Sequence, residues 1–158
     1  LYLLDLNEEM LLEGRKRLKK EKNIKYFIGN AEKLNFENNF FDKYTISFCL
    51  RNVTEYLLSI KEAYRVLKPG GKYCCLEFST PKSSLISSSY KIYKSKILPL
   101  LGEIVAKDKN AYKYLSESID LFPSQEELSK NLSDCGFTKV ETINLFNGIV
   151  AIHTGYKL

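Results

Sequence analysis

Short apolar segments alternate with stretches of helical periodicity along the first half of the chain, and this alternation limits the fold more than any other feature. The apolar segments are residues 1–4, 24–28, 44–50 and 72–78. Each has the length of a strand, and continuous apolar runs are typical of strands buried on both faces of a parallel sheet. Strands that alternate with helices therefore predict an α/β fold.

Local signals set the expected ends of the helices. Asn7 is the predicted N-cap of a first helix. That helix begins with acidic residues and ends in the basic residues 15–20. Thr54 is expected to cap a second helix, and Pro69-Gly70-Gly71 to stop it and turn the chain. Ser124 and Glu127 form a predicted capping box. These signals predict three helices and the turns that separate them from the strands.

The second half of the chain departs from the alternation. Residues 82–120 are predicted to be mostly helical, as an insertion within one domain that spans residues 1–158. Residues 137–145 and 149–156 are predicted strands, joined at Asn147-Gly148. That dipeptide favours a β-hairpin, so the sheet is expected to end antiparallel.

Composition excludes several classes of protein. No apolar run reaches the roughly 20 residues that span a bilayer, and no signal peptide is visible. The net charge of +5 is modest, and the basic residues 15–20 fit a solvated helix face better than a nucleic-acid site. The chain has one histidine and four cysteines without a CxxC pair, so we expect reduced thiols and no metal site.

Polar residues follow three of the predicted strands, where parallel sheets bind ligands. Asp5 could accept two ribose hydroxyls with its forked carboxylate, or it could cap the following helix. Asn30 and Ala31 could read the edge of an adenine, or form an ordinary turn. The stretch from Ser47 to Thr54 places Arg51 and Asn52 beside a predicted helix, where they could belong to a site. Alternatively, Asn52 or Thr54 caps that helix and Arg51 forms a surface ion pair.

The motifs together resemble one enzyme family. Residues 65–79, Arg-Val-Leu-Lys-Pro-Gly-Gly-Lys-Tyr-Cys-Cys-Leu-Glu-Phe-Ser, look like a signature of the UbiE family of ubiquinone and menaquinone C-methyltransferases. The segments 47–54, 112–119, 122–125 and 148–155 also resemble family motifs, the last two in the variant of the mitochondrial members. The resemblance covers essentially the whole chain. It implies a class I methyltransferase fold, Rossmann-like, that binds S-adenosylmethionine (SAM).

Residue roles follow from the resemblance, position by position. It implies that Asp5 binds the ribose, that Asn30 and Ala31 lie at the adenine, and that Ser47 contacts the cofactor. Arg51 and Asn52 match the catalytic pair; Arg51 is a poor base because its guanidinium stays protonated, so we expect it to stabilise a phenolate or position a water. Cys49 replaces a usual glycine and Lys91 a common aspartate.

The resemblance also implies a substrate and a location. We expect C-methylation of a polyprenyl benzoquinol on the matrix side of the mitochondrial inner membrane, or in the cytoplasm of a bacterium. We also expect a homodimer, membership of a quinone-biosynthesis complex and peripheral contact with the membrane. We do not expect the protein to bind nucleic acid. The apolar residues of 82–109, with their lysines, suit a lid over a polyprenyl tail or a lipid-facing surface, as well as an ordinary helical cover.

The sequence is also compatible with other functions. The chain could be a catalytically inert, truncated scaffold component of such a complex, a menaquinone C-methyltransferase, or a nicotinamide-dependent dehydrogenase using Asp5. The methyltransferase motifs and the final hairpin favour a methyltransferase over a dehydrogenase. His153 is an alternative base, although a lone histidine in a strand is more often structural.

The start of the chain carries one more expectation. Leu1 lies inside a predicted strand that matches the family's second strand, so the first strand and its glycine-rich loop are absent from these 158 residues. In the class I sheet that first strand is central. We therefore expect a gap between two neighbouring strands, and a sequence shorter than the functional domain.

Overall fold

The computed structural model describes residues 1–81, 90 and 109–158. Helices and strands follow one another in this order: β1 (Tyr2–Asp5), α1 (Glu8–Arg17), β2 (Lys25–Ile28), β3 (Phe41–Ser47), the 3-10 turn η1 (Leu50–Asn52), α2 (Tyr56–Val66), β4 (Leu67–Phe78), α5 (Lys109–Leu121), α6 (Gln125–Asp134), β5 (Thr138–Leu145), the 3-10 turn η4 (Phe146–Gly148) and β6 (Val150–Tyr156).

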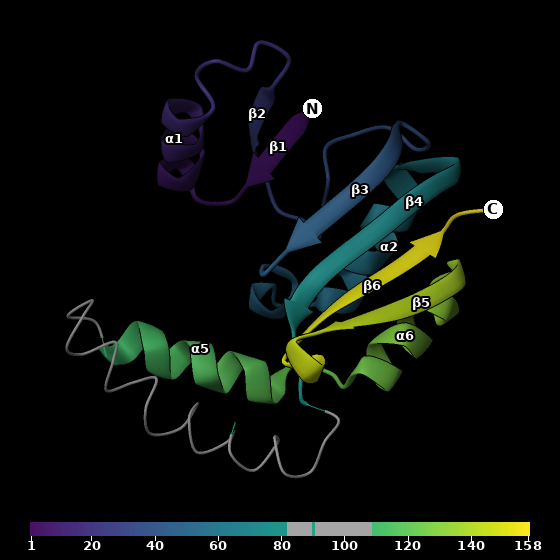
Figure 1. The fold of residues 1–158 in the computed structure, drawn as a ribbon. Helices are drawn as coiled ribbons and strands as arrows, with labels where there is room; N and C mark the ends of the chain where they lie inside the picture. Colours follow the sequence, from purple (N-terminus) through teal and green to yellow (C-terminus); the bar gives the residue numbers. More distant parts are fainter. Residues whose placement is uncertain (82–89, 91–108) are drawn as a thin grey trace.

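The strands form two separate sheets (Figure 1). In the smaller, β1 and β2 pair in parallel, and in the larger the order is β3-β4-β6-β5. β3 and β4 are parallel, whereas β6 is antiparallel to both of its neighbours. The α/β class and the antiparallel final hairpin are thus confirmed, with Asn147 and Gly148 both at positive φ in the connecting turn. Among the residues that the structure describes, no strand pairs with both β1 and β3, at the position where the sequence predicts a gap.

Two boundaries predicted from sequence are wrong near η1. The strand predicted to reach Leu50 ends at Ser47, because Phe48 adopts a left-handed conformation with φ 52° and the chain turns into η1. Thr54 does not cap α2; Glu55 occupies the N-cap position and makes no side-chain cap bond. By contrast, Asn7 and Ser124 cap α1 and α6 as predicted, each accepting backbone N–H bonds.

The Pro69-Gly70-Gly71 stretch also differs from the prediction. It was expected to stop a helix and turn the chain, but α2 ends at Val66 and the stretch lies inside β4. The register between β3 and β4 is irregular here, so the stretch works as a bulge. A side chain at position 71 would place its Cβ 2.7 Å from the Lys68 carbonyl oxygen, which explains why glycine is needed.

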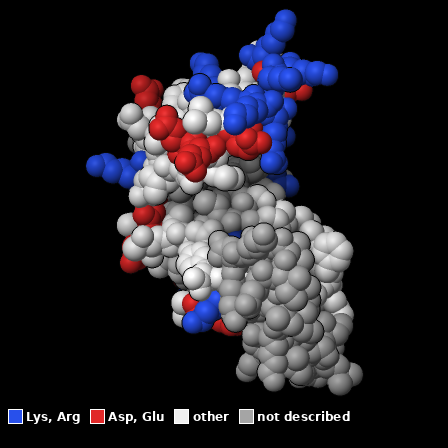
Figure 2. Space-filling model, turned by 90° about the vertical axis from the view of Figure 1, so that its left-hand side faces the viewer, with Lys and Arg blue, Asp and Glu red and all other residues white. Residues whose placement is uncertain are grey.

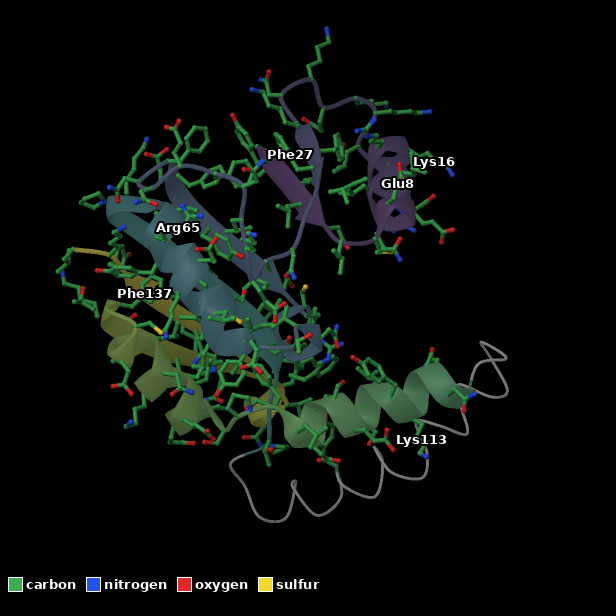
Figure 3. All side chains as sticks on the ribbon, turned by 180° about the vertical axis from the view of Figure 1, so that it is seen from behind. Glu8, Lys16, Phe27, Arg65, Lys113 and Phe137 are labelled. Carbon is green, nitrogen blue, oxygen red and sulfur yellow. The ribbon has the colours of Figure 1, made fainter. Side chains whose placement is uncertain are left out.

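The main core lies between the four-stranded sheet and helices α2 and α6, which cover the same face (Figures 1 and 3). Its members include Leu50, Ile60, Leu67, Tyr73 and Leu132, all almost fully buried. Helices cover this face because their apolar residues recur at helical spacing. This packing holds the ends of β3 and β4 in fixed positions.

Aromatic rings connect the small sheet to the large one. The rings of Tyr2, Phe27, Phe36, Phe40 and Phe41 pack with centroids 4.8–6.0 Å apart. They bridge β1 and β2 to the start of β3 and so bury apolar surface that the separated sheets would otherwise expose.

Part of the predicted helical insertion is seen. Residues 109–121 form α5, but 82–89 and 91–108 lie outside the described residues, and with them the proposed lid or lipid-facing surface and Lys91. The assignment of residues 1–158 to one domain stays a prediction. Within the described ranges, no helix has the length and apolarity needed to cross a membrane.

Candidate active site

Four strands end close to the predicted site residues: β1 and β2, which pair in parallel, and β3 and β4, which also pair in parallel. β1 ends at Asp5, β3 at Ser47 and β4 at Phe78, while Asn30 follows β2 by two residues. In Figure 1 the arrowheads of β1, β3 and β4 point to one edge of the molecule, and α5 lies beneath the ends of β3 and β4. The structure therefore brings the predicted residues to one edge, the one where parallel sheets bind ligands.

Asp5 uses one carboxylate oxygen within the chain. Its Oδ1 accepts a hydrogen bond from the backbone N–H of Asn7 at 2.8 Å, which fixes the turn into α1. Asn7, not Asp5, caps the helix. Within the described residues no bond engages Oδ2, so the carboxylate keeps an acceptor for a ligand hydroxyl.

The Asn30 side chain forms its hydrogen bonds within its own turn. Its Oδ1 accepts from the backbone of Glu32 at 2.8 Å, and its Nδ2 donates to the Glu32 carboxylate at 3.0 Å. Glu32 also accepts from the backbone N–H of Glu55, which ties this loop to the start of α2. The Asn30 side chain therefore orders the loop, and Ala31 is held within the same turn.

Two apolar side chains at this edge were missed by the sequence reasoning. Leu6 follows Asp5 and is 71% exposed; Ile28 is the register partner of Asp5 and is 61% exposed. Exposed aliphatic side chains beside a free carboxylate oxygen suit a ligand with a flat apolar ring and hydroxyl groups. The signal lay in the sequence, because an apolar residue follows the polar end of one strand and another ends the next.

Ser47 and Cys49 lie exposed at the end of β3. Although Cys49 is exposed, neighbouring atoms partly desolvate its thiol and raise its pKa, the negative charges of Asp5 and Glu77 raise it further, and Arg51 lowers it. Of the two carboxylates that influence this pKa, Asp5 ends β1 and Glu77 lies in β4.

Arg51 lies in a buried ion pair, which corrects the alternative of a surface pair. Its side chain is 9% exposed, and its Nη1 is 2.8 Å from Oε1 of Glu77, whose side chain is 1% exposed. Nη1 also donates to the Phe48 carbonyl at 2.6 Å. The guanidinium lies over the Phe78 ring, 5.3 Å from its centroid. The ion pair, the carbonyl and the ring together hold the guanidinium in one position after the end of β3.

Asn52 connects η1 to α5. Its Nδ2 donates to the Phe48 carbonyl at 3.4 Å, and its Oδ1 accepts from the Tyr114 hydroxyl at 3.3 Å. Tyr114 is itself half-exposed. Asn52 therefore does not cap α2, and the alternative interpretation of this residue is wrong. Tyr114, from α5, contacts Asn52, although the sequence gave this tyrosine no role at the site.

His153 lies away from this edge, in β6 against α6. Its Nδ1 is 3.3 Å from the Ser129 hydroxyl and 3.1 Å from the Thr142 hydroxyl. Burial lowers the pKa of His153 to about 4, against a smaller opposing effect of Glu126. A buried histidine bonded to two hydroxyls has a structural role, as the sequence favoured.

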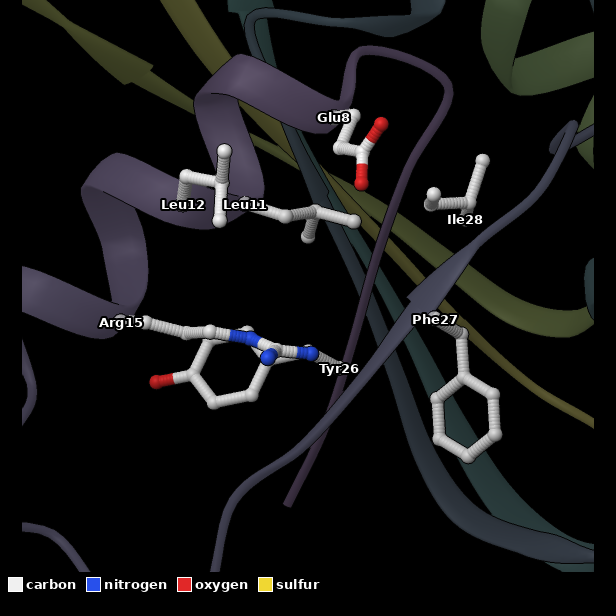
Figure 4. Close-up of a pocket in the computed structure, with 7 residues that line it drawn as sticks. All are labelled: Glu8, Leu11, Leu12, Arg15, Tyr26, Phe27 and Ile28. Atoms are coloured by element: carbon white, nitrogen blue, oxygen red, sulfur yellow. The ribbon is translucent and has the colours of Figure 1, made fainter.

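A separate pocket lies between α1 and β2 (Figure 4). It has a volume of about 300 Å³ and is lined by Glu8, Leu11, Leu12, Arg15, Tyr26, Phe27 and Ile28. Ile28, which lies at the candidate site, also lines this pocket, but none of the site residues predicted from sequence does. Within the ranges that the structure describes, no group of His, Cys, Asp and Glu is placed to hold a metal ion.

Basic residues gather at the opposite end of the molecule from the carboxyl ends of the strands. Figure 2 shows Lys and Arg side chains clustered at the end that carries the last turn of α1 and the following loop. Lys16 and Arg17 are highly exposed and pair with Glu13. This is a solvated helix face, as the sequence indicated.

Comparison with solved structures identifies the fold. The chain superimposes on an SAM-dependent methyltransferase from Thermotoga maritima with a TM-score of 0.68 and 21% identity, covering 99% of this chain and 72% of that one. The order β3-β4-β6-β5, with β6 antiparallel, agrees with this likeness. The protein thus has the class I SAM-dependent methyltransferase fold.

Sequence comparison then gives the family. The model of the ubiE/COQ5 methyltransferase family matches residues 1–157, and the chain belongs to that family. It is 49% identical to the mitochondrial 2-methoxy-6-polyprenyl-1,4-benzoquinol methylase of Gallus gallus over 98% of this chain and 50% of that protein. It is 49% identical to the ubiquinone/menaquinone biosynthesis C-methyltransferase UbiE of Rickettsia bellii over 100% of this chain and 65% of that protein. The chain thus spans one half to two thirds of these relatives.

Proposed function

We propose that the protein is a SAM-dependent C-methyltransferase that methylates a ring carbon of a polyprenyl benzoquinol in ubiquinone biosynthesis. The observation that carries this proposal is the buried Arg51 at the carboxyl ends of β3 and β4, in a chain of the ubiE/COQ5 family. The names of the chicken and Rickettsia relatives support the choice of substrate.

The residues at this edge fit SAM. Asp5 has a carboxylate oxygen left for the ribose hydroxyls, and the exposed Leu6 and Ile28 offer apolar surface to the adenine. Asn30 would act through its turn, which holds Ala31 and the neighbouring backbone beside the ring. Ser47 lies exposed at the end of β3, where a cofactor contact is proposed. When bound, SAM supplies an electrophilic methyl group and leaves as a neutral thioether.

The chain's own residues would act on the quinol. A ring carbon attacks well only when a neighbouring hydroxyl has given up its proton, which leaves negative charge on that oxygen. Arg51 cannot take this proton, because its guanidinium stays protonated. It can stabilise the phenolate oxygen by charge and hydrogen bonding, while water takes the hydroxyl proton and later the proton of the methylated carbon. Asn52 would hold η1 against α5 and so keep Arg51 in place.

The location is proposed in part from a relative's name. The chicken relative is mitochondrial by name, which supports a mitochondrial location; we propose the matrix side of the inner membrane, or the cytoplasm in a bacterial source. Peripheral membrane contact, a homodimer and a quinone-biosynthesis complex stay predictions. A menaquinone precursor is the second candidate substrate, since the Rickettsia relative is named for both quinones.

Labelled methyl transfer tests the proposal. The protein is incubated with methyl-labelled SAM and a benzoquinol carrying a short prenyl tail, with a naphthoquinol as the competing substrate. We expect label on a benzoquinol ring carbon, and a loss of about 2–4 kcal/mol of transition-state stabilisation in Arg51→Ala. Arg17→Ala, an exposed arginine in α1, is the matched control and should leave turnover unchanged. Label on a ring oxygen, or full turnover in Arg51→Ala, would refute the proposal.

A further inference from the structure

The internal contacts of Arg51 use one side of its guanidinium. Nη1 donates to Oε1 of Glu77 at 2.8 Å and to the Phe48 carbonyl at 2.6 Å. The Phe78 ring lies against the guanidinium and also contacts the Phe48 ring, with centroids 4.8 Å apart. One nitrogen is therefore anchored at two points, and an aromatic ring supports the group.

Glu77 is the main anchor. It is almost completely buried in β4, where it accepts from Arg51 Nη1 and from the backbone N–H groups of Arg51 and Phe78. Burying an ion pair adds little net stability compared with apolar side chains of the same size. Core packing therefore does not explain a glutamate between apolar residues of a central strand, whereas holding Arg51 does.

Phe48 supplies the second anchor through an unusual backbone. Its φ of 52° is in the left-handed region, which bulky residues rarely adopt. This conformation ends β3 and turns the Phe48 carbonyl toward both Arg51 and Asn52. Strained backbone of this kind persists where surrounding contacts fix it, and it is common at functional sites.

The opposite side of the guanidinium has no partner within the described residues. Arg51 Nε is buried and without an acceptor there, and no hydrogen bond joins Nη2 to those residues. A buried donor without an acceptor is costly, and a ligand oxygen would remove that cost. Nε and Nη2 form the planar fork with which arginine binds oxyanions.

We propose that Glu77 is a positioning residue: it holds Arg51 by Nη1, so that the Nε and Nη2 fork faces the ring oxygen of the quinol on which negative charge develops. This inference rests on the proposed function and adds to it the residue that orients the arginine and the side of the arginine that meets the substrate. Glu77 itself touches neither substrate nor cofactor.

Chemical rescue separates this role from a purely structural one. In Arg51→Ala, added methylguanidinium can occupy the vacated space, and the carboxylate of Glu77 would hold it there. We expect rescue to raise kcat at least about tenfold, as one charge-assisted hydrogen bond warrants. In the double variant Arg51→Ala/Glu77→Gln, the same concentration of methylguanidinium should give no rescue. Equal rescue in both backgrounds would overturn the inference.

Single variants give a second readout. Glu77→Gln should lower kcat about 10²-fold, the scale of a misplaced catalytic group, while KM for the quinol and Kd for SAM stay within about threefold. Glu62→Gln is the matched control, because Glu62 also pairs with an arginine, Arg65, but within α2. Rates are expressed per folded molecule, from circular dichroism. If Glu77→Gln does not fold, Glu77→Asp is used instead. It keeps the charge on a side chain one methylene shorter and should lower kcat by a smaller factor.

The two proposals fail in different ways. No methyl transfer by the unsubstituted protein would overturn the proposed function and the inference together. Transfer that Arg51→Ala abolishes, but that Glu77→Gln and Glu77→Asp leave at full kcat, would overturn the inference alone.

Discussion

Arg65 holds the small sheet to the large one, and its removal tests how the two are connected. From α2 its guanidinium donates to the carbonyls of Leu34 and Phe36 at 2.9 and 2.8 Å, to Asn38 at 2.8 Å and to both carboxylate oxygens of Glu62. Residues 34–38 lead from β2 to β3. The arginine therefore fixes the connection between the sheets (Figure 3).

Arg65→Ala should lower the free energy of unfolding by about 3 kcal/mol. Two partly buried carbonyls lose charged donors, at about 1–1.5 kcal/mol each. The partly exposed pair with Glu62 adds about 0.5 kcal/mol. Urea unfolding at pH 7, followed by circular dichroism, measures the total. Arg17→Ala, whose side chain is 77% exposed, is the control and should cost less than about 0.5 kcal/mol.

Two further measurements show where the loss arises. Hydrogen exchange should become faster at the β1 and β2 amides than in β4 and β6, because Arg65 restrains the small sheet. The hydrogen bond from Arg65 lowers the pKa of Glu62, so this pair stabilises the fold at neutral pH and its contribution fades as pH falls below the ordinary value of 4.5. The deficit of Arg65→Ala should therefore shrink in acid. A cost below about 1 kcal/mol at pH 7, or equal to that of Arg17→Ala, would refute this role.

Two other predictions concern the fold. Because burial lowers the pKa of His153 to about 4, the folded state resists protonation while the unfolded state binds a proton below about pH 6.5. The free energy of unfolding should thus fall as pH drops from about 6.5 to about 4. In urea titrations, His153→Gln should reduce this fall by about 1 kcal/mol or more. The same pH dependence in His153→Gln and the unsubstituted protein would contradict this prediction. Gly136→Ala should cost about 1–3 kcal/mol in thermal unfolding, because φ is +105° and the new Cβ would lie 2.9 Å from the Tyr64 ring. Gly70→Ala, with φ +81° and no atom within 4 Å, separates strain from clash and should cost less; equal costs would argue against the clash.

Local sequence patterns predicted most of the strands, two helix starts and the final hairpin. Apolar runs predicted the strands, Asn7 and Ser124 predicted two helix starts, and Asn147-Gly148 predicted the final hairpin. These features are local, so neighbouring residues determine them. The strand boundary at Ser47 was not predictable, because Phe48 leaves the strand through a left-handed backbone that tertiary contacts stabilise.

The site was predicted as a set of residues, and not as a set of contacts. The resemblance named Asp5 and Arg51, and the structure places both at the carboxyl ends of strands. It gave no sign that Glu77, 26 positions from Arg51, is its partner. The available signal was a charged residue on the buried face of β4, where Tyr73 and Cys75 precede it at alternate positions. Pairing across strands depends on the fold and cannot be inferred from spacing alone.

Calorimetric binding of SAM tests the central claim that the carboxyl ends of β1, β2 and β3 form the cofactor site. Asp5→Ala removes the free carboxylate oxygen and should weaken binding about 10- to 100-fold, the value of a hydrogen bond to a charged group. Asp42→Asn, an exposed aspartate that pairs with Lys68 near the start of β3, is the control and should bind like the unsubstituted protein. SAM binding that Asp5→Ala leaves unchanged would contradict the account.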